Sequence, residues 1–173
     1  MATRNSAKPL TGTRIVSLAL NLPGPAALMR LSAMGARCLK VEPPGPGTTS
    51  AGRPISGDPM GQYDIGAYSV MHADVRVVQM DLKTERGQAQ LARALLRADL
   101  LLTSFRPSAL AKLGLDWKSL RRPFPHLSMV EIVGAPGERA DEPGHDLTYL
   151  AEAGLVTGTD LPPSLLADMA GAL

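Results

Sequence analysis

The chain has little of several features that mark common functional classes. Its 173 residues contain one cysteine, Cys38, which excludes an internal disulfide, and no Cys/His cluster has zinc-site spacing. Aromatic residues make up only 3%, too few for the stacking surfaces that hold single-stranded nucleic acid. The charge excess of 18 minus 16, or +2, is too small to indicate nucleic-acid binding. The sequence therefore predicts neither a metal site nor a nucleic-acid partner.

Long apolar runs are also missing. No run reaches the roughly 18 residues of a membrane span, and the opening "MATRNSAKPL" has no apolar signal core. We therefore expect a soluble cytoplasmic protein without a membrane partner. Hydrophobic residues at 45% and charged residues at 20% are ordinary globular usage, and the length suits one domain with a real core.

Strand-like and helix-like segments alternate along the chain. Apolar runs rich in β-branched residues predict strands at 13–20, 37–42, 75–82, 99–105 and 126–134. Amphipathic spacing predicts helices at 25–35, 84–98, 106–115 and 116–124, with Thr84 as an N-terminal cap. The Gly- and Pro-rich residues 43–66 predict a long loop, and Cys38 is expected in a core strand. This alternation predicts an α/β fold with a mostly parallel sheet.

Ligands of such sheets bind beyond the carboxyl ends of the strands. Four loops are therefore candidates: Asn21–Pro25, Pro43–Gly66, Ser104–Pro107 and Gly134–His145. The glycine-rich "PGPGTTSAG" is neither G-x-G-x-x-G nor a Walker loop, and the chain has no G-x-S-x-G elbow. The site is therefore expected in individual side chains rather than in a phosphate-binding motif.

Several side chains have two interpretations. Arg106 in "SFRPS" is either solvated or faces a phosphate or carboxylate at a helix N-terminus. In "GHDLTY", either Asp146 caps a helix and His145 is an exposed loop residue, or His145 is a general acid/base. Asp168 lies in an apolar helix start, where a carboxylate is costly unless it is paired, and a desolvated carboxylate can act as nucleophile or base.

The last segment, "PPSLLADMAGAL", predicts the first turns of an apolar helix with Ser164 as a possible cap. A helix this apolar needs a partner on most of its surface, so we expect that missing chain or a second chain covers it. His72 and His126 have no evident partners in the sequence and are expected on the surface.

Together these segments resemble the N-terminal part of the family III CoA-transferases, the carnitine dehydratase and bile-acid-inducible protein F type that includes α-methylacyl-CoA racemase. The resemblance is carried by residues 10–44, "DLKTERGQAQLARALLRADLLLTSFRPSALAKLGLDWKSL", "GHDLTYLAEAGL" and "PPSLLADMAGAL". It implies a Rossmann-like large domain, of which residues 1–173 are the N-terminal portion, with the small domain and C-terminal segment absent. It also implies a homodimer, because the family's two chains interlock.

The resemblance implies a CoA-dependent acyl enzyme. The first hypothesis is transfer of CoA between an acyl-CoA and a carboxylic acid, with Asp168 attacking the thioester to form a mixed anhydride and then an aspartyl-CoA thioester. The alternative is an α-methylacyl-CoA racemase-like reaction, in which His145 and Asp168 move the α-proton. A third possibility is an incomplete, inactive fragment that binds CoA or depends on a partner chain.

The ligands implied by the same resemblance are coenzyme A, as acyl-CoA, and a carboxylate acceptor for transfer, with no metal. The residues implied to line the CoA site are Ser104, Phe105 and Arg106. The loop residues implied to approach the acyl group are Asn21, Leu22 and Pro23. Glu42 and Pro43 are implied near the nucleotide. The chain departs from the family pattern at Ser104, where Asn is usual, and at Met71–Asp74, which lacks a basic residue.

Overall fold

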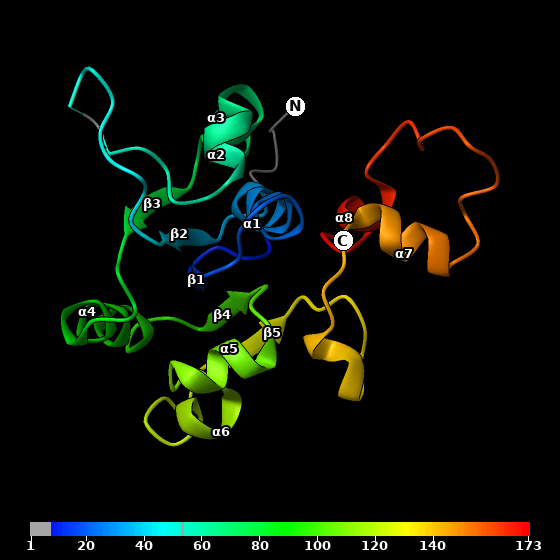
Figure 1. Ribbon diagram of the computed structural model, residues 1–173. Helices are drawn as coiled ribbons and strands as arrows, with labels where there is room; N and C mark the ends of the chain where they lie inside the picture. Colours follow the sequence, from blue (N-terminus) through cyan, green and yellow to red (C-terminus); the bar gives the residue numbers. More distant parts are fainter. Residues whose placement is uncertain (1–7, 53) are drawn as a thin grey trace, which may run out of the picture.

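The computed structural model describes residues 8–52 and 54–173 and forms one α/β unit (Figure 1). The strands are β1 (Arg14–Ser17), β2 (Arg37–Glu42), β3 (Arg76–Gln79), β4 (Leu100–Thr103) and β5 (Ser128–Glu131). The helices are α1 (Pro23–Ala33), α2 (Met60–Tyr63), α3 (Ile65–Met71), α4 (Glu85–Leu95), α5 (Pro107–Lys112), α6 (Trp117–Leu120), the 3₁₀ helix η1 (Gly137–Asp141), α7 (Asp146–Glu152) and α8 (Leu166–Ala170).

All five strands are parallel and lie in the order β3-β2-β1-β4-β5. The chain adds strands outward from β1 to β3 and then returns to place β4 on the other side of β1. The order therefore reverses between β1 and β4, which is where open α/β sheets bind ligands. The predicted Rossmann-like, mostly parallel α/β fold is confirmed.

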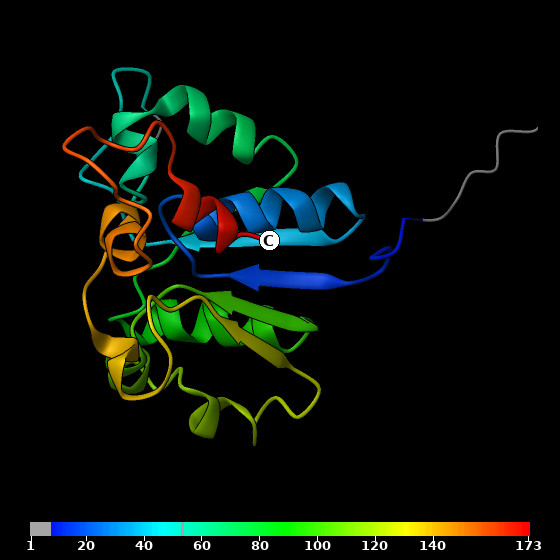
Figure 2. The same ribbon diagram turned by 90° about the vertical axis from the view of Figure 1, so that its right-hand side faces the viewer.

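The sheet is covered on both faces because its strands are apolar on both faces. Ile15 and Cys38 pack with Leu28 of α1 on one face. The neighbouring Val16 points to the other face and packs with Leu91 of α4 in the main core. Figures 1 and 2 show α1 and α4 on opposite sides of the sheet. The predicted core position of Cys38 is confirmed, and burial raises the pKa of its thiol to about 11.

Two turns explain where helices begin. A Cβ on Gly24 would lie 2.1 Å from the Cβ of Ala19, so the tight reversal between β1 and α1 requires glycine. Thr84 caps α4 as predicted, because its Oγ1 accepts from the Gly87 amide at 3.1 Å.

The expected loop of residues 43–66 is interrupted by α2 and the start of α3, where Asp64 accepts from the Ala67 amide at 2.9 Å. The sequence does not predict this cap, because Gly and Pro dominate the segment.

Among the described residues, no helix combines the length and apolar character needed to cross a membrane.

Candidate active site

The loops after β1 and β4 meet at the point where the strand order reverses. The Leu20 amide donates to Oγ of Ser104 at 3.2 Å and ties the two loops together. Asn21 follows with φ of 62°, a left-handed conformation that a non-glycine residue adopts only when its surroundings hold it. Leu22 and Pro23, both partly buried, then begin α1. The structure therefore brings Asn21, Leu22, Pro23 and Ser104 together at the carboxyl ends of β1 and β4.

Helix α8, which carries Asp168, lies against the start of α1. The buried Ala172, which follows α8, packs beside Ala26 of α1 and Met60 of α2. Figure 2 shows α8 lying along α1, on the side away from α4. A Cβ on Gly171, which directly follows α8, would lie 3.8 Å from the Cβ of Pro23, so the end of the Asp168 helix lies near the Asn21–Pro23 turn although the two are far apart in sequence.

Asp146 fixes the backbone at Asp168. Its Oδ1 accepts from the Asp168 amide at 2.9 Å, and its side chain is only 5% exposed. Asp146 therefore accepts a hydrogen bond from an amide in the first turn of α8, and not from an amide of its own helix α7. The interpretation of Asp146 as the cap of α7 is wrong, because His145 occupies that position. Ser164 is not the cap of α8 either, since Leu165 stands there.

His145 is exposed at the N-terminus of α7, as both of its interpretations allow. The loop that leads to it is held by Tyr149. A Cβ on Gly134 or on Gly144 would lie 2.1 Å or 2.5 Å from the Tyr149 hydroxyl oxygen, so the ring is in close contact with both glycines. This packing fixes the backbone immediately before His145.

The electrostatics of Asp168 suit a reactive carboxylate. Burial raises its pKa above the ordinary aspartate value, and the nearby Asp146 charge raises it further. His145 acts in the opposite direction and lowers this pKa, so the two predicted catalytic side chains interact electrostatically. A carboxylate with a raised pKa is a stronger base, which favours both nucleophilic attack and proton abstraction.

The Asp146 charge can be separated from its hydrogen bond. Asp146→Asn keeps an oxygen that accepts from the Asp168 amide but removes the charge, so we expect the pKa of Asp168 to fall. Activity that needs the Asp168 carboxylate rises with pH through this pKa, so its acidic limb is expected to move to lower pH. The titration of the Asp168 carboxyl carbon by ¹³C NMR measures the shift.

An exposed carboxylate in the preceding loop provides the control. Asp160→Asn is expected to leave the Asp168 titration where it is. An Asp168 midpoint that stays in place in Asp146→Asn would show that the two carboxyl groups do not interact.

The remaining predicted CoA-site residues do not all face the turn. Phe105 packs partly buried against the main core. Arg106 is exposed at the N-terminus of α5, and its charge helps to lower the pKa of Asp141, whose main cause is the hydrogen bond from the Ser108 amide. Arg106 therefore has a carboxylate neighbour on η1. Its exposed guanidinium still offers hydrogen-bond donors to an anionic ligand.

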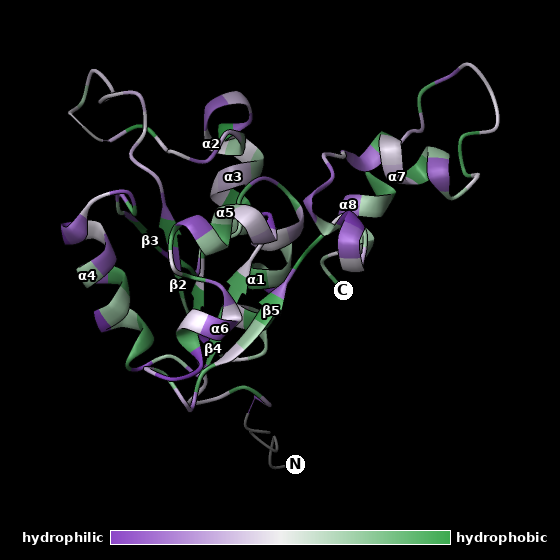
Figure 3. Cartoon of the chain, turned by 60° about the horizontal axis from the view of Figure 1, so that its bottom comes forward, coloured by the Kyte–Doolittle hydropathy of each residue, from purple (hydrophilic) through white to green (hydrophobic). Residues whose placement is uncertain are grey.

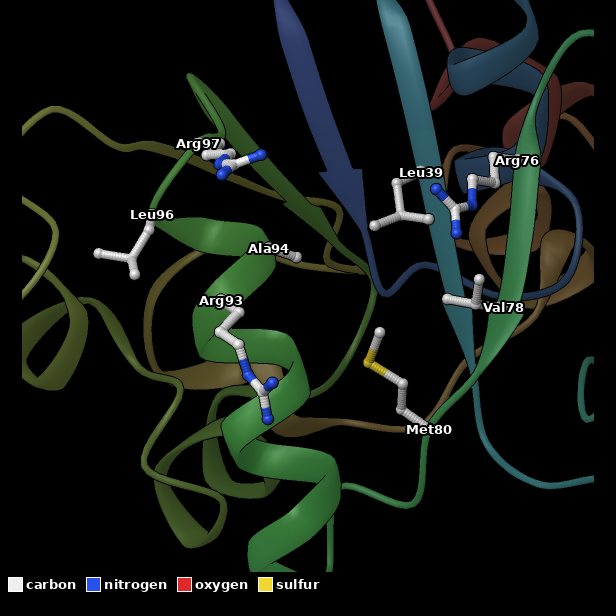
Figure 4. Close-up of a pocket in the computed structure, with 8 residues that line it drawn as sticks. All are labelled: Leu39, Arg76, Val78, Met80, Arg93, Ala94, Leu96 and Arg97. Carbon is white, nitrogen blue, oxygen red and sulfur yellow. The ribbon is translucent and has the colours of Figure 1, made fainter.

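A groove of about 500 Å³ lies elsewhere, between strands β2 and β3 on one side and helix α4 on the other (Figure 4). Three arginines and five apolar side chains line it: Arg76, Arg93, Arg97, Leu39, Val78, Met80, Ala94 and Leu96. It is on the α4 face, opposite the face that carries α1. Within residues 8–52 and 54–173, no group of three or more His, Cys, Asp or Glu side chains is placed to hold a metal ion.

One buried cluster beneath the turn was not predicted. His72 was expected on the surface but is only 7% exposed, whereas His126 is exposed as predicted. His72 lies beside Lys40, which is 0% exposed on β2. The sequence signal was a lysine inside the apolar run "RCLKVE", since lysine is almost never fully buried unless it is paired. Glu42, implied near the nucleotide, is also buried in this cluster.

The segment from α7 to α8 exposes apolar side chains. Leu161 is 78% exposed and Met169 is 47% exposed, with Leu155, Leu165 and Leu166 also exposed. Figure 3 colours stretches of this segment green, the colour of hydrophobic residues. The last helix therefore presents apolar surface to solvent, and what covers it stays a prediction.

Comparison with known proteins gives a consistent family. Residues 10–169 match the model of CoA-transferase family III. A Mycobacterium tuberculosis protein named probable fatty acyl-CoA transferase Rv3272 is 36% identical over 94% of this chain and 41% of its own length. The cinnamoyl-CoA:phenyllactate CoA-transferase of Clostridium sporogenes is 32% identical over 94% and 41%. Human alpha-methylacyl-CoA racemase is 33% identical over 94% and 40%.

The fold comparison agrees. The crystal structure of Rv3272 superposes with a TM-score of 0.74 at 32% identity, covering 96% of this chain and 48% of that chain. This chain therefore spans less than half of the length of these relatives.

Proposed function

The chain belongs to CoA-transferase family III, and from this membership we propose that it takes part in CoA transfer between an acyl-CoA and a carboxylic acid, with Asp168 as nucleophile. The observation that carries the proposal is the position of Asp168. It is half-buried, its amide is held by Asp146, and the end of its helix packs against Pro23, at the turn where the strand order reverses.

The residues present fit an acyl-CoA at this edge. Leu22 and Pro23 offer partly buried apolar surface for an acyl group. Ser104 and Arg106 offer polar and cationic groups at the end of β4, where a phosphate-bearing chain would lie. We propose these residues, with Asn21 and Phe105, as the CoA-binding set.

Transfer then proceeds at the Asp168 carboxylate. A carboxylate oxygen attacks the thioester carbonyl carbon, the C–S bond breaks, and the CoA thiolate leaves with the electron pair. The thiolate attacks the Asp168 carbonyl of the anhydride, which gives an aspartyl-CoA thioester and releases the first carboxylic acid as its carboxylate. The acceptor carboxylate attacks this thioester, and return of the thiolate to the acceptor's acyl carbon frees Asp168. Four easier steps replace one difficult exchange.

A racemase-like reaction is the second candidate, and one observation favours it. His145 directly precedes Asp146, whose carboxylate accepts from the Asp168 amide at 2.9 Å, and the charge of His145 lowers the pKa of Asp168. The thioester acidifies the α-proton, and one side chain removes it while the other returns a proton to the opposite face.

Hydroxylamine and solvent deuterium separate the two reactions. Transfer is expected to leave an acylated or thioesterified Asp168 that hydroxylamine converts to a hydroxamate, detectable by peptide mass spectrometry. Racemisation exchanges the α-proton of a 2-methylacyl-CoA with deuterium and needs no acceptor. A chain that shows neither, with CoA bound or not, would be an inactive fragment and would overturn the proposal of catalysis.

A further inference from the structure

Beneath the Asn21 turn lies a buried polar cluster that the proposed reaction does not use. It occupies the α1 side of the sheet, between β2 and α3, and consists of Lys40, Glu42, Ser56, Asp58, Tyr68 and His72. Among the described residues, no buried side-chain nitrogen or oxygen lacks a hydrogen-bond partner. The cluster is therefore a fully bonded network, which rigidifies what it contacts.

Lys40 is the centre of the network. Its ammonium has three donors and three acceptors around it: Asp58 Oδ2, Glu42 Oε1 at 3.0 Å and His72 Nε2 at 2.9 Å. His72 Nδ1 lies 2.6 Å from the Tyr68 carbonyl oxygen, so Nδ1 carries the hydrogen and Nε2 accepts from Lys40. Burial, with the charge of Lys40, lowers the pKa of His72 and keeps the ring neutral. The position of the ammonium is thus fixed by three groups.

Glu42 is held independently. The Tyr68 hydroxyl donates to its Oε1 at 2.6 Å and the Ser56 hydroxyl donates to its Oε2 at 2.7 Å. Burial raises the pKa of Glu42, but these two bonds and the charge of Lys40 bring it below the ordinary value. Glu42 therefore remains charged and anchors Lys40 from the strand side.

Asp58 connects this network to the Asn21–Pro23 turn. While Oδ2 pairs with Lys40, Oδ1 accepts from the Asn21 amide at 3.1 Å and from the Met60 amide at 3.0 Å. Asn21 is the non-glycine residue with a positive φ in the described chain. The buried carboxylate thus holds the strained residue by its backbone.

The two amides that donate to Asp58 lie beside the surface on which α8 rests. Leu22, which follows Asn21, and Met60 belong to the same apolar cluster as Ala172, which follows α8. A Cβ on Gly171 would lie 3.8 Å from the Cβ of Pro23. A shift of the turn or of α2 would therefore shift the surface on which the Asp168 helix rests.

We propose that Asp58, oriented by Lys40, is a positioning residue that holds the Asn21–Pro23 turn and the α2 N-terminus in the arrangement that seats Asp168. The inference rests on the proposed function in so far as Asp168 is the reacting group. Asp58 itself contacts no reacting atom in this scheme.

The test is Asp58→Asn, followed by amide exchange and by steady-state kinetics. Asp58→Asn removes the charge that orients the side chain against Lys40, so the Asn21 amide is expected to exchange with solvent at least about tenfold faster. Turnover is expected to fall by up to about 10²-fold through kcat, with KM little changed, because the reacting carboxylate is misplaced.

Two further variants complete the design. Asp64→Asn alters an exposed carboxylate of the same segment that also accepts a backbone amide, and it is expected to change neither quantity. Asp58→Glu keeps a charge beside Lys40 and displaces the oxygen from the two amides. If Asp58→Asn does not fold, Asp58→Glu is expected to show the same changes.

The outcomes are distinct. Unchanged Asn21 exchange, or a change in KM with kcat unchanged, would make Asp58 a core residue without a positioning role and would overturn the inference. Amide exchange needs no substrate, so it still decides whether Asp58 holds the turn if the unaltered chain proves inactive and the proposed function fails.

Discussion

Replacement of Asp168 by alanine is expected to abolish turnover while CoA binding is largely kept. Both proposed reactions need this carboxylate, either to attack the thioester or to move the α-proton, and loss of a covalent nucleophile typically lowers kcat by about 10⁴-fold or more. CoA is expected to bind along the loops after β1 and β4, which Asp168 does not form. Steady-state kinetics and calorimetry on the same variant check the two halves of this expectation.

Asp160→Ala is the matched control, because Asp160 is an exposed carboxylate in the loop that precedes α8. It is expected to retain ordinary turnover. Turnover that survives in Asp168→Ala would show that Asp168 has been wrongly assigned.

Replacement of Lys40 by methionine is expected to cost about 3–5 kcal/mol of unfolding free energy, since removal of one partner of a buried ion pair leaves an uncompensated charge. Lys40 is 0% exposed, and its loss leaves two buried carboxylates, Asp58 and Glu42, without their cationic partner. Small domains are stable by only about 5–15 kcal/mol, so this loss is a large part of the total unfolding free energy. Urea unfolding followed by circular dichroism measures the change.

Lys118→Met provides the comparison on the surface. Lys118 is an exposed residue of α6, where substitutions usually change stability by less than about 0.5 kcal/mol. If Lys40→Met and Lys118→Met unfold at the same urea concentration, the Lys40 network does not stabilise the fold.

The parts of the structure that the sequence predicts well are those determined by local pattern. Alternating strands and helices, the cap at Thr84 and the buried strand position of Cys38 all depend on neighbours along the chain. The same holds for the start of α5 at Pro107, because a proline favours the first position of a helix. The alternation of strands and helices likewise predicts the parallel sheet.

What could not be predicted depends on contacts between distant residues. Lys40, Asp58 and His72 come together only after β2, α2 and α3 have packed, so nothing next to His72 in sequence shows that it is buried. Likewise, Asp146 bonds to Asp168 across two helices, and a local pattern assigned it to its own helix. The division into a large and a small domain, the homodimer and the roles of the site residues stay predictions.

We propose that the carboxyl ends of β1 and β4, where the strand order reverses, form an acyl-CoA site close to the Asp168 helix. Titration of this chain with CoA and acetyl-CoA by calorimetry, with its mass in solution measured alongside, tests this proposal. We expect saturable binding of one ligand per chain, weakened when Arg106 is replaced by glutamate. A chain of defined mass that releases no heat with either ligand would contradict it.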